Sequence, residues 1–426
     1  MTLIPGDKPG AASVASDTRQ SKGPLTGVKV VEYGDFISAP FCTRLMADLG
    51  AEVVKVEPPD CGDSSRRYGP FPQDSPHREK SGLYLYLNAN KLGVTLDIGT
   101  ATGANMFRQL LAQADVLVEN HAPGHLDKFG LGYQSLKEHF PRLIVTSITP
   151  FGQTGPYRDY KAYAINCSAA AGWSLIVGEP GREPLTPPLS MGHYISALSA
   201  STATMVAVIA RRLTGRGQQI DVSEVECLNS LLSGVAANAF VYYGRMRMRH
   251  GNRSPAAYPY AVLPCKDGYM WMIAIQGHEW KRFLDVLGGG KPPDWYESDP
   301  RFKDRLKAGR EYADELDARL APWLMSHTKQ EIFQLCRDNH IPFAPVNDID
   351  EVVNNEHLNA RGFFVELEHP EAGRLKYPGE PQKFSRTPWS LRSAAPTLGQ
   401  HNEEVFCGRL GVPKQELALL RAGGVI

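Results

Sequence analysis

The stretch VKVVEYGDFISAPFCTRLMADLGAEVVKVE, residues 28–57, decides the fold class. Its first part, VKVVEY (28–33), is a short run rich in β-branched residues. PFCTRLMADLG (40–50) has apolar residues at helical spacing and ends in a glycine, and AEVVKVE (51–57) again has the pattern of a strand. The stretch therefore predicts a β-α-β unit.

The same alternation continues through the first half of the chain. VTLDI (94–98), DVLVEN (115–120) and LIVTSI (143–148) predict strands, with a helix from about Thr100 to Gln113 between the first two. Alternation of this kind favours an α/β fold with a parallel sheet, whose ligands bind at the carboxyl ends of the strands. The candidate site is therefore the set of loops that follow strands: GDFISAP, PPDCGDSSRR, ENHAPGHLDKFG and TPFGQTGPYRDYK.

The middle of the chain is expected to be helical, and the segment after it has a different character. AINCSAAAGWS (164–174) predicts a closely packed helix, His193 to Leu213 predicts a long buried helix, and residues 223–244 predict another, with Ser223 and Glu226 as a capping box. YPYAVLPCKDGYMWMIAI (258–275) predicts two strands joined by a K-D-G turn, and amphipathic helices follow. We expect a disordered tail (1–24), a large domain (25–245), a small α+β domain (250–350) and a return to the large domain (351–426).

Composition and charge exclude several classes of function. The 426 residues carry 46 Lys plus Arg and 46 Asp plus Glu, with no basic block, so neither nucleic acid nor an anionic membrane is expected as a partner. We expect no membrane span, because no apolar run looks long enough, and no signal peptide. The seven cysteines never have C-x-x-C spacing, which argues against a zinc site or a disulfide framework and favours the reducing cytoplasm. Nothing indicates a metal.

A series of motifs in order along the chain carries a family resemblance. They resemble the successive signatures of the class III CoA-transferases, the family of formyl-CoA and carnitine CoA-transferases and of 2-methylacyl-CoA racemase. The resemblance implies a Rossmann-like large domain that holds CoA, a smaller inserted domain, and two chains threaded through one another as an interlocked dimer. It begins at Gly27 and rests on residues 27–70, LYLYLNANKLGVTLDI, ADVLVENHAPGHLDKFGLGY, PRLIVTSITPFGQTGPY, RRLTGRGQQIDVSEVE, PCKDGYMWM and IPFAPVNDIDEV.

The resemblance also implies where catalytic acids belong, and this chain lacks them at both places. In the transferases the nucleophile is the aspartate of a Gly-Asp pair before the long helix, and here the pair reads Gly192–His193. A second acidic position, in the segment YKAYAINCS, is occupied by Ala164. No catalytic residue of the family type is therefore expected in this chain.

The positions that contact CoA in the family are better kept. By resemblance, the CoA-binding residues are Asn120, His121 and Lys128 in the loop after DVLVEN, with Lys161 and Tyr163 in a Lys-x-Tyr segment. Lysine suits a phosphate as a point charge, and loops at strand ends offer backbone N–H groups to a pyrophosphate. Two basic residues that the family often has are replaced here, by Pro58 and Leu92.

The chemistry of the family indicates what the loss of the aspartate means. By resemblance, a carboxylate attacks an acyl-CoA to give a mixed anhydride and then holds CoA as a thioester on its own carbonyl. Imidazole has no carbonyl on which to hold CoA, so His193 cannot take over this role. The chain is therefore expected to be the non-nucleophilic subunit of a heteromeric enzyme that moves CoA from an acyl-CoA, such as succinyl-CoA, to a carboxylic acid, such as benzylsuccinate. Its expected partner is a homologous catalytic subunit, in a heterodimer or heterotetramer, as in the benzylsuccinate CoA-transferase of anaerobic toluene degradation.

Two alternatives stay open. The first is a self-sufficient transferase with changed chemistry that uses His193 or a neighbouring acid such as Asp35, which could instead cap the following helix. The second is a racemase or isomerase. Cys167 is most simply a buried apolar residue. The aromatic residues Trp173, Tyr194 and Phe240 fit an acyl pocket or the core equally well.

Overall fold

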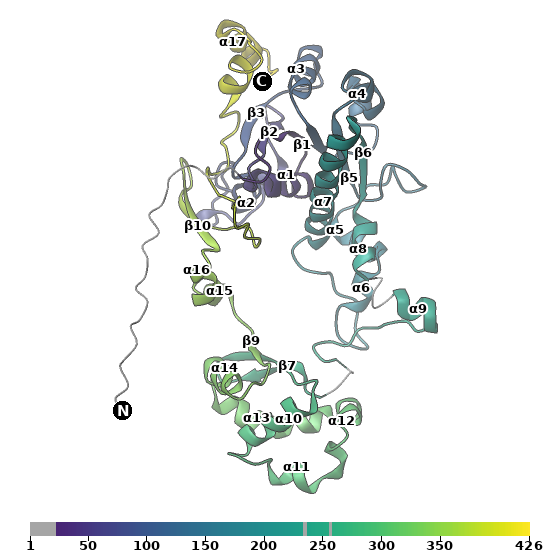
Figure 1. Cartoon of the computed structure of the whole chain (residues 1–426), viewed down its shortest axis with the longest axis vertical. Coiled ribbons are helices and arrows are strands. Elements are labelled where there is room, and N and C mark those ends of the chain that lie inside the picture. The colour runs from purple at the N-terminus through teal and green to yellow at the C-terminus, as the bar shows by residue number, and fades with distance from the viewer. Residues whose placement is uncertain (1–22, 233–236, 255–257) are drawn as a thin grey trace, which may run out of the picture.

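The computed structural model describes residues 23–232, 237–254 and 258–426 (Figure 1). The expected disordered tail therefore lies outside the described residues, apart from its last two positions. Residues 233–236 of the helix expected over 223–244 also lie outside them.

A six-stranded parallel sheet forms the larger part of the molecule. Its strand order is β3-β2-β1-β4-β5-β6, so the direction in which strands are added reverses between β1 and β4. The predicted β-α-β unit is confirmed as β1, helix α1 (Ser38–Asp48) and β2. The strands are β1 (Lys29–Tyr33), β2 (Glu52–Glu57), β3 (Leu92–Thr95), β4 (Val116–Glu119), β5 (Ile144–Thr149) and β6 (Gln219–Ser223).

Apolar residues on both faces of these strands bury the sheet between two helical layers. Alternate residues of one strand point to opposite faces, so Val30 packs with α1 and α7 (Met191–Thr214), whereas Val31 packs with α3 (Ala101–Ala112). Helix α4 (Tyr133–His139) and the C-terminal helix α17 (Lys414–Ala422) complete the second layer. The expected α/β fold with a parallel sheet is confirmed.

Helix α7 is long, but the expectation that it is buried is only half right. Its buried side chains are mostly small ones on one side, including Ala197, Ala200 and Ala207, and its other side is exposed. The expectation of no membrane-length apolar run was wrong here, because Met191 to Ala210 carries no Asp, Glu, Lys or Arg. By length and composition α7 could cross a membrane, and in this fold 33% of its apolar window is buried.

Short helices lie along the chain between β5 and a second, smaller part. The expected helix over 164–174 is divided into α5 (Ala164–Ala170) and α6 (Trp173–Ile176), and the one expected over 223–244 gives α8 (Glu224–Leu232) and α9 (Asn238–Tyr243). The Ser223 hydroxyl accepts a hydrogen bond from the Glu226 backbone N–H at 3.4 Å, which is half of the expected capping box.

The smaller part has its own core beneath a three-stranded antiparallel sheet. The predicted K-D-G hairpin is confirmed as β7 (Tyr260–Cys265) and β8 (Gly268–Ile273), with the short β9 (Ala344–Pro345) beside β8. The covering helices are α10 (Gly277–Leu287), α11 (Asp294–Ser298), α12 (Arg305–Glu311), α13 (Ala313–Ser326) and α14 (Lys329–Asp338). Figure 1 shows one connection between the two parts through α15 (Ile349–Val353) and α16 (Glu356–Ala360), and along the chain the other follows α9, which precedes β7.

After the hairpin β10 (Phe364–His369) and β11 (Gly373–Pro378), the chain returns to the large sheet. There it lies along edge strand β3, where Asn402 Oδ1 accepts from the Thr95 N–H at 2.8 Å. The Val425 carbonyl accepts from the Asp97 N–H, also at 2.8 Å. Val405 and Phe406 of a π-helical segment (Glu403–Cys407) enter the same core as α3. The last residues of the chain thus cover the edge of the sheet.

Candidate functional site

The first cavity of the site lies where the strand order reverses, which is where parallel α/β sheets bind ligands. We call it the switch-point cavity. Its volume is about 470 Å³, and it lies at the carboxyl ends of β1, β2 and β4. It is lined by Tyr33, Gly34, Asp35, Phe36, Val56, Glu57, Pro58, Cys61, Gly62, Asp63, Ser64, Arg67, Asn120, His121, Ala122, Tyr163 and His193.

A second cavity of about 340 Å³ lies at the N-terminal end of α7, and we call it the helix-entry cavity. Phe36, Tyr163 and His193 line both cavities, so these three side chains mark the place where the two meet. The helix-entry cavity is lined by Phe36, Tyr68, Tyr163, Ala164, Ile165, Ser168, Thr186, Pro187, Leu189, Ser190, Met191 and His193.

His193 is held at this junction by a buried carboxylate. Its Nδ1 lies 2.7 Å from Oε2 of Glu224, the first residue of α8, and the Glu224 side chain is only 4% exposed. Leu189 and Ser190, just before α7, both have left-handed backbone conformations, with φ of 58° and 50°. Non-glycine residues adopt this conformation only where the surrounding structure enforces it. The left-handed backbone of Leu189 and Ser190 therefore sets the direction in which α7 begins, and with it the position of His193.

Phe36 forms the other side of the junction. Its ring lies edge-on to the His193 imidazole, with centroids 5.8 Å apart, and 4.8 Å from the ring of Tyr68. Phe36 also has a left-handed backbone, with φ of 65°, and its N–H donates to Asp63 Oδ1 at 3.2 Å. Asp63 therefore holds the strained turn that presents Phe36 to the site.

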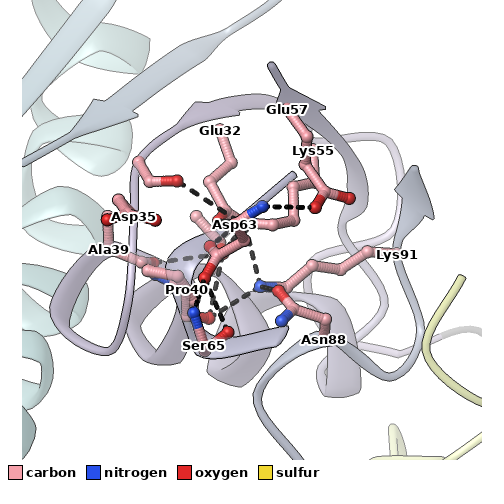
Figure 2. Close-up of polar contacts among 12 residues, drawn as sticks. Glu32, Asp35, Ala39, Pro40, Lys55, Glu57, Asp63, Ser65, Asn88 and Lys91 are labelled. Atoms are coloured by element: carbon pink, nitrogen blue, oxygen red, sulfur yellow. Dashed lines mark hydrogen bonds and ion pairs between the residues drawn. The ribbon is translucent and has the colours of Figure 1, made fainter. Parts of the chain in front are cut away.

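Asp63 belongs to a buried cluster of charges beneath this wall (Figure 2). Lys55 Nζ donates to Asp63 Oδ2 at 2.6 Å and to Glu32 Oε1 at 2.7 Å, and Lys91 Nζ donates to Glu32 Oε2 at 2.8 Å. All four side chains are at most 2% exposed. Two cations thus offset two carboxylates, which is the condition under which charges can be buried.

The protonation behaviour of the cluster follows from this balance. Burial opposes ionisation of Glu32, but the two lysines outweigh it and lower the pKa of Glu32 to about 2. Burial lowers the pKa of Lys91 to about 8, although Glu32 acts in the opposite direction. The cluster ties β1 and β2 to the loop that carries Asp63, so it fixes one wall of the switch-point cavity.

Asp35 is engaged by its neighbours and does not cap the helix that follows it. Its two carboxylate oxygens accept from the N–H and the hydroxyl of Ser64, both at 2.7 Å. Helix α1 has no side-chain cap. Asn120 ties the same loop to β4, because its Oδ1 accepts from the Asp35 N–H at 2.8 Å and its Nδ2 donates to the Asp35 carbonyl at 2.7 Å.

His121 is packed in a stack of rings. Its centroid lies 4.6 Å from that of Tyr33 and 4.5 Å from that of His125. Burial, with a smaller contribution from His125, lowers the pKa of His121 to about 4. The imidazole is therefore neutral at pH 7 and contributes no charge to the lining of the switch-point cavity.

The structure brings together only some of the residues that the sequence predicts for the site. Asn120, His121, Tyr163 and His193 line the switch-point cavity, and Ala164 lines the helix-entry cavity beside His193. Lys128 and Lys161 are exposed and are not among the described residues that line either cavity.

The sequence interpretation missed two functional candidates. Arg67 lines the switch-point cavity and its Nη1 donates to the Cys61 carbonyl at 3.3 Å, so a guanidinium is present although Pro58 replaces the expected basic residue. Its signal was the pair of arginines that ends PPDCGDSSRR. Glu224 was missed as well, and its signal was an acid directly beside the capping residue Ser223.

The other side chains singled out from the sequence lie outside the two cavities. Cys167 is fully buried, and burial together with the neighbouring Glu224 carboxylate raises the pKa of its thiol, in agreement with an inert apolar role. Trp173 donates from its indole N–H to the Leu228 carbonyl, and Tyr194 lies edge-on to Phe41. Phe240 is 59% exposed and lines neither cavity, so neither of the two alternatives left open for it, core or acyl pocket, holds in this chain. Among the described residues, no group of three or more His, Cys, Asp or Glu side chains could hold a metal ion.

The chain belongs to CoA-transferase family III, whose profile matches residues 25–402. It is 34% identical over 410 residues to the β subunit of succinyl-CoA–L-malate CoA-transferase from Chloroflexus aurantiacus, covering 95% of this chain and 98% of that one. It is 31% identical over 393 residues to the subunit BbsE of succinyl-CoA:(R)-benzylsuccinate CoA-transferase from Thauera aromatica, covering 91% and 94%. Among solved structures, a CaiB/BaiF family protein from Brucella suis has 30% identity and a TM-score of 0.83, covering 91% of this chain and all of that one. The family resemblance seen in the sequence is confirmed.

Proposed function

We propose that this chain is the non-nucleophilic subunit of a heteromeric CoA-transferase that moves CoA from an acyl-CoA such as succinyl-CoA to a carboxylic acid. The observation that carries the proposal is the junction of the two cavities. The positions that the family resemblance assigns to the two acids are occupied by His193, at the junction, and by Ala164, which lines the helix-entry cavity beside it. Neither side chain can hold CoA as a thioester.

The carboxylates nearest the junction support the same conclusion. Glu224 is buried and paired with His193, and Asp35 has both oxygens hydrogen-bonded to Ser64. A carboxylate whose lone pairs are engaged by donors is a weaker nucleophile than a free one. The nucleophile of the proposed enzyme is therefore supplied by the partner subunit.

The switch-point cavity offers groups suited to CoA. Arg67 provides a guanidinium for a phosphate, and the neutral rings of Tyr33 and His121 provide an apolar surface at the reversal of strand order. Lys128 and Lys161, which the family resemblance assigns to CoA, lie on the outer surface, where they can act on phosphates that extend beyond the cavity.

Exposed apolar side chains support the presence of a partner chain. Large apolar side chains are exposed on α7 and around α9, a pattern typical of an interaction surface. They are Leu198, Val206, Ile209, Leu213, Phe240, Val241, Tyr242 and Tyr243. We propose a homologous subunit as the partner, in an interlocked dimer or a pair of such dimers, located in the cytoplasm. Among the relatives, the Chloroflexus and Thauera proteins are each named as one subunit of a CoA-transferase.

The test is native mass spectrometry combined with a CoA-transfer assay, using succinyl-CoA with benzylsuccinate or L-malate as acceptor. The chain is expressed alone and then with its closest homologue from the same genome. We expect transfer only by the mixed complex, and we expect it to survive His193→Ala. Transfer by the chain alone, abolished by His193→Ala, would overturn the proposal.

A further inference from the structure

The pairing of His193 with Glu224 is more elaborate than a subunit without a catalytic role requires. Glu224 is nearly fully buried, and among the described residues its only ion-pair partner is His193. The buried Cys167 thiol is its other close neighbour. A buried carboxylate costs free energy unless it is paired, so His193 is what holds this charge at the point where the two cavities meet.

The geometry fixes which ring nitrogen carries the proton. A carboxylate can only accept a hydrogen bond, so Nδ1 of His193 is the donor to Glu224 Oε2 at 2.7 Å. In the neutral imidazole the lone pair is then on Nε2. No described residue hydrogen-bonds Nε2, and His193 lines both cavities. A base oriented by a carboxylate and open to a substrate cavity is the arrangement that general-base catalysis requires.

We propose that His193 is a general base that gives this chain an acyl-CoA hydrolase activity of its own, with water as the acceptor. Nε2 takes a proton from a water molecule as the water oxygen attacks the thioester carbonyl carbon. The C–S bond then breaks, and the proton on Nε2 passes to the departing CoA sulfur. The products are the free carboxylic acid and CoA thiol, and no covalent enzyme intermediate forms.

The surroundings of His193 favour water over a second carboxylic acid as acceptor. Transfer through the enzyme needs a side chain that can hold CoA while one acid leaves and another enters, and imidazole has no group for this. Hydrolysis needs only a base and space for water. The small side chain of Ala164 lines the same cavity as His193, and its methyl group leaves that space open.

The proposal rests on the proposed function in one respect, namely that a CoA thioester binds in the switch-point cavity. The first measurement is therefore calorimetry with CoA on the purified chain, alone and in the mixed complex. The second is the release of CoA thiol from butyryl-CoA and succinyl-CoA, after subtraction of the rate without enzyme. We expect CoA to bind and thiol to be released without any acceptor acid.

Variants separate a catalytic His193 from a structural one. We expect His193→Gln to lower the rate of hydrolysis by about 100-fold or more and Glu224→Gln by about 10-fold, in line with the usual contribution of a general base. His139→Gln on the exposed surface of α4 is the matched control and leaves the rate unchanged. Added imidazole should restore part of the rate to His193→Ala, which a folding defect would not allow.

The outcomes distinguish this inference from the proposed function. CoA binding without thiol release above the uncatalysed rate overturns the hydrolase alone, as does hydrolysis that is unchanged in His193→Gln. Absence of CoA binding overturns both the hydrolase and the CoA-holding role. The transfer activity of the mixed complex tests the subunit role independently of all of these results.

Discussion

The carboxylate of Glu224 occupies the space that a side chain at position 192 would need. A Cβ added to Gly192 would lie 2.3 Å from Glu224 Oε1 and 3.1 Å from Cδ1 of Leu228. Gly192, in the first turn of α7, is therefore required for Glu224 to reach His193. The absence of a side chain at position 192 is therefore tied to the contact between α7 and α8.

This relationship predicts that Gly192→Ala destabilises the protein. The methyl group must push away a buried carboxylate, and we expect a loss of about 1–3 kcal/mol in the free energy of unfolding, as for overpacked cores. Gly277→Ala is the matched control, because Gly277 is also in the first turn of a helix and a Cβ there meets nothing within 4 Å. Denaturant unfolding of both variants measures the difference, and equal stability would contradict the contact.

The buried charge cluster predicts a large effect from removing one cation. In Lys55→Met, Glu32 keeps its ion pair with Lys91, but Asp63 loses the one cation that is ion-paired with it among the described residues. An uncompensated buried carboxylate costs about 3–5 kcal/mol. Lys291→Met removes a cation from the exposed pair with Asp294 and should leave stability unchanged within error. Thermal unfolding at one protein concentration compares them. A small effect of Lys55→Met would show that the cluster is not ionised as described.

Glu119 predicts a pH dependence of stability. Burial, only partly offset by hydrogen bonds from Ser147 and the His121 N–H, raises the pKa of Glu119 from 4.5 to about 7. Between these values the folded state binds a proton that the unfolded state does not, so stability falls as the pH rises from 4.5 to 7. The fall attributable to this group is about 3 kcal/mol.

The measurement is the difference in unfolding free energy between wild type and Glu119→Gln from pH 4.5 to 8. Over this range we expect the unfolding free energy of the variant, relative to that of the wild type, to rise by about 3 kcal/mol. Glu416→Gln, on the exposed side of α17, should follow the wild type. A difference that does not vary with pH would show that Glu119 ionises in the fold as it does in the unfolded chain.

Because Arg67 lines the switch-point cavity, we predict that its removal weakens the binding of CoA. Hydrogen bonds to charged groups contribute about 1.5–3 kcal/mol, so Arg67→Ala should raise the Kd for CoA by about 10-fold or more. Arg78→Ala is the control, since Arg78 is 63% exposed and lies outside the lining of the cavity. The affinity for dephospho-CoA shows which phosphate is involved. If the two variants bind CoA with equal affinity, Arg67 does not contact CoA.

The exposed face of α7 predicts the oligomeric state. Val206 and Ile209 are each 60% exposed and lie three residues apart, on one side of the helix. Val206→Glu combined with Ile209→Glu should shift the complex toward single chains in native mass spectrometry, because two carboxylates would be buried in the interface. Leu419→Glu changes a residue of α17 that is 73% exposed and should leave the assembly intact. An unchanged mass for the double variant would place the partner on another surface.

The core of the fold could be predicted from the sequence because its strands have local patterns. VKVVEY and AEVVKVE have β-branched residues on both faces and are interrupted by a helix that ends before a glycine, so neighbouring residues suffice. The exact position of β3 could not be predicted in this way. VTLDI indicates a strand over 94–98, but the Asp97 N–H pairs with the carbonyl of Val425, and the strand proper covers Leu92–Thr95.

The site could be predicted only in part for the same reason. Loops after strands indicated where ligands bind, and four of the predicted residues do meet there. Glu224 and Lys55 could not be given roles, because their partners are distant in sequence. The pair His193–Glu224 spans 31 residues, and Lys91 reaches Glu32 across 59. Such contacts depend on how the elements pack, which local periodicity does not specify.

The segment that covers edge strand β3 has a consequence for biosynthesis. The backbone N–H groups of Thr95 in β3 and of Asp97 just after it donate to Asn402 and Val425. Both acceptors leave the ribosome more than 300 residues later than their donors. All six strands of the large sheet are therefore synthesised before the segment that covers the edge of β3. The whole smaller part is synthesised between them. An unpaired strand border is a template for association with other chains. The border at β3 is therefore open to such association until the C-terminal segment pairs with it.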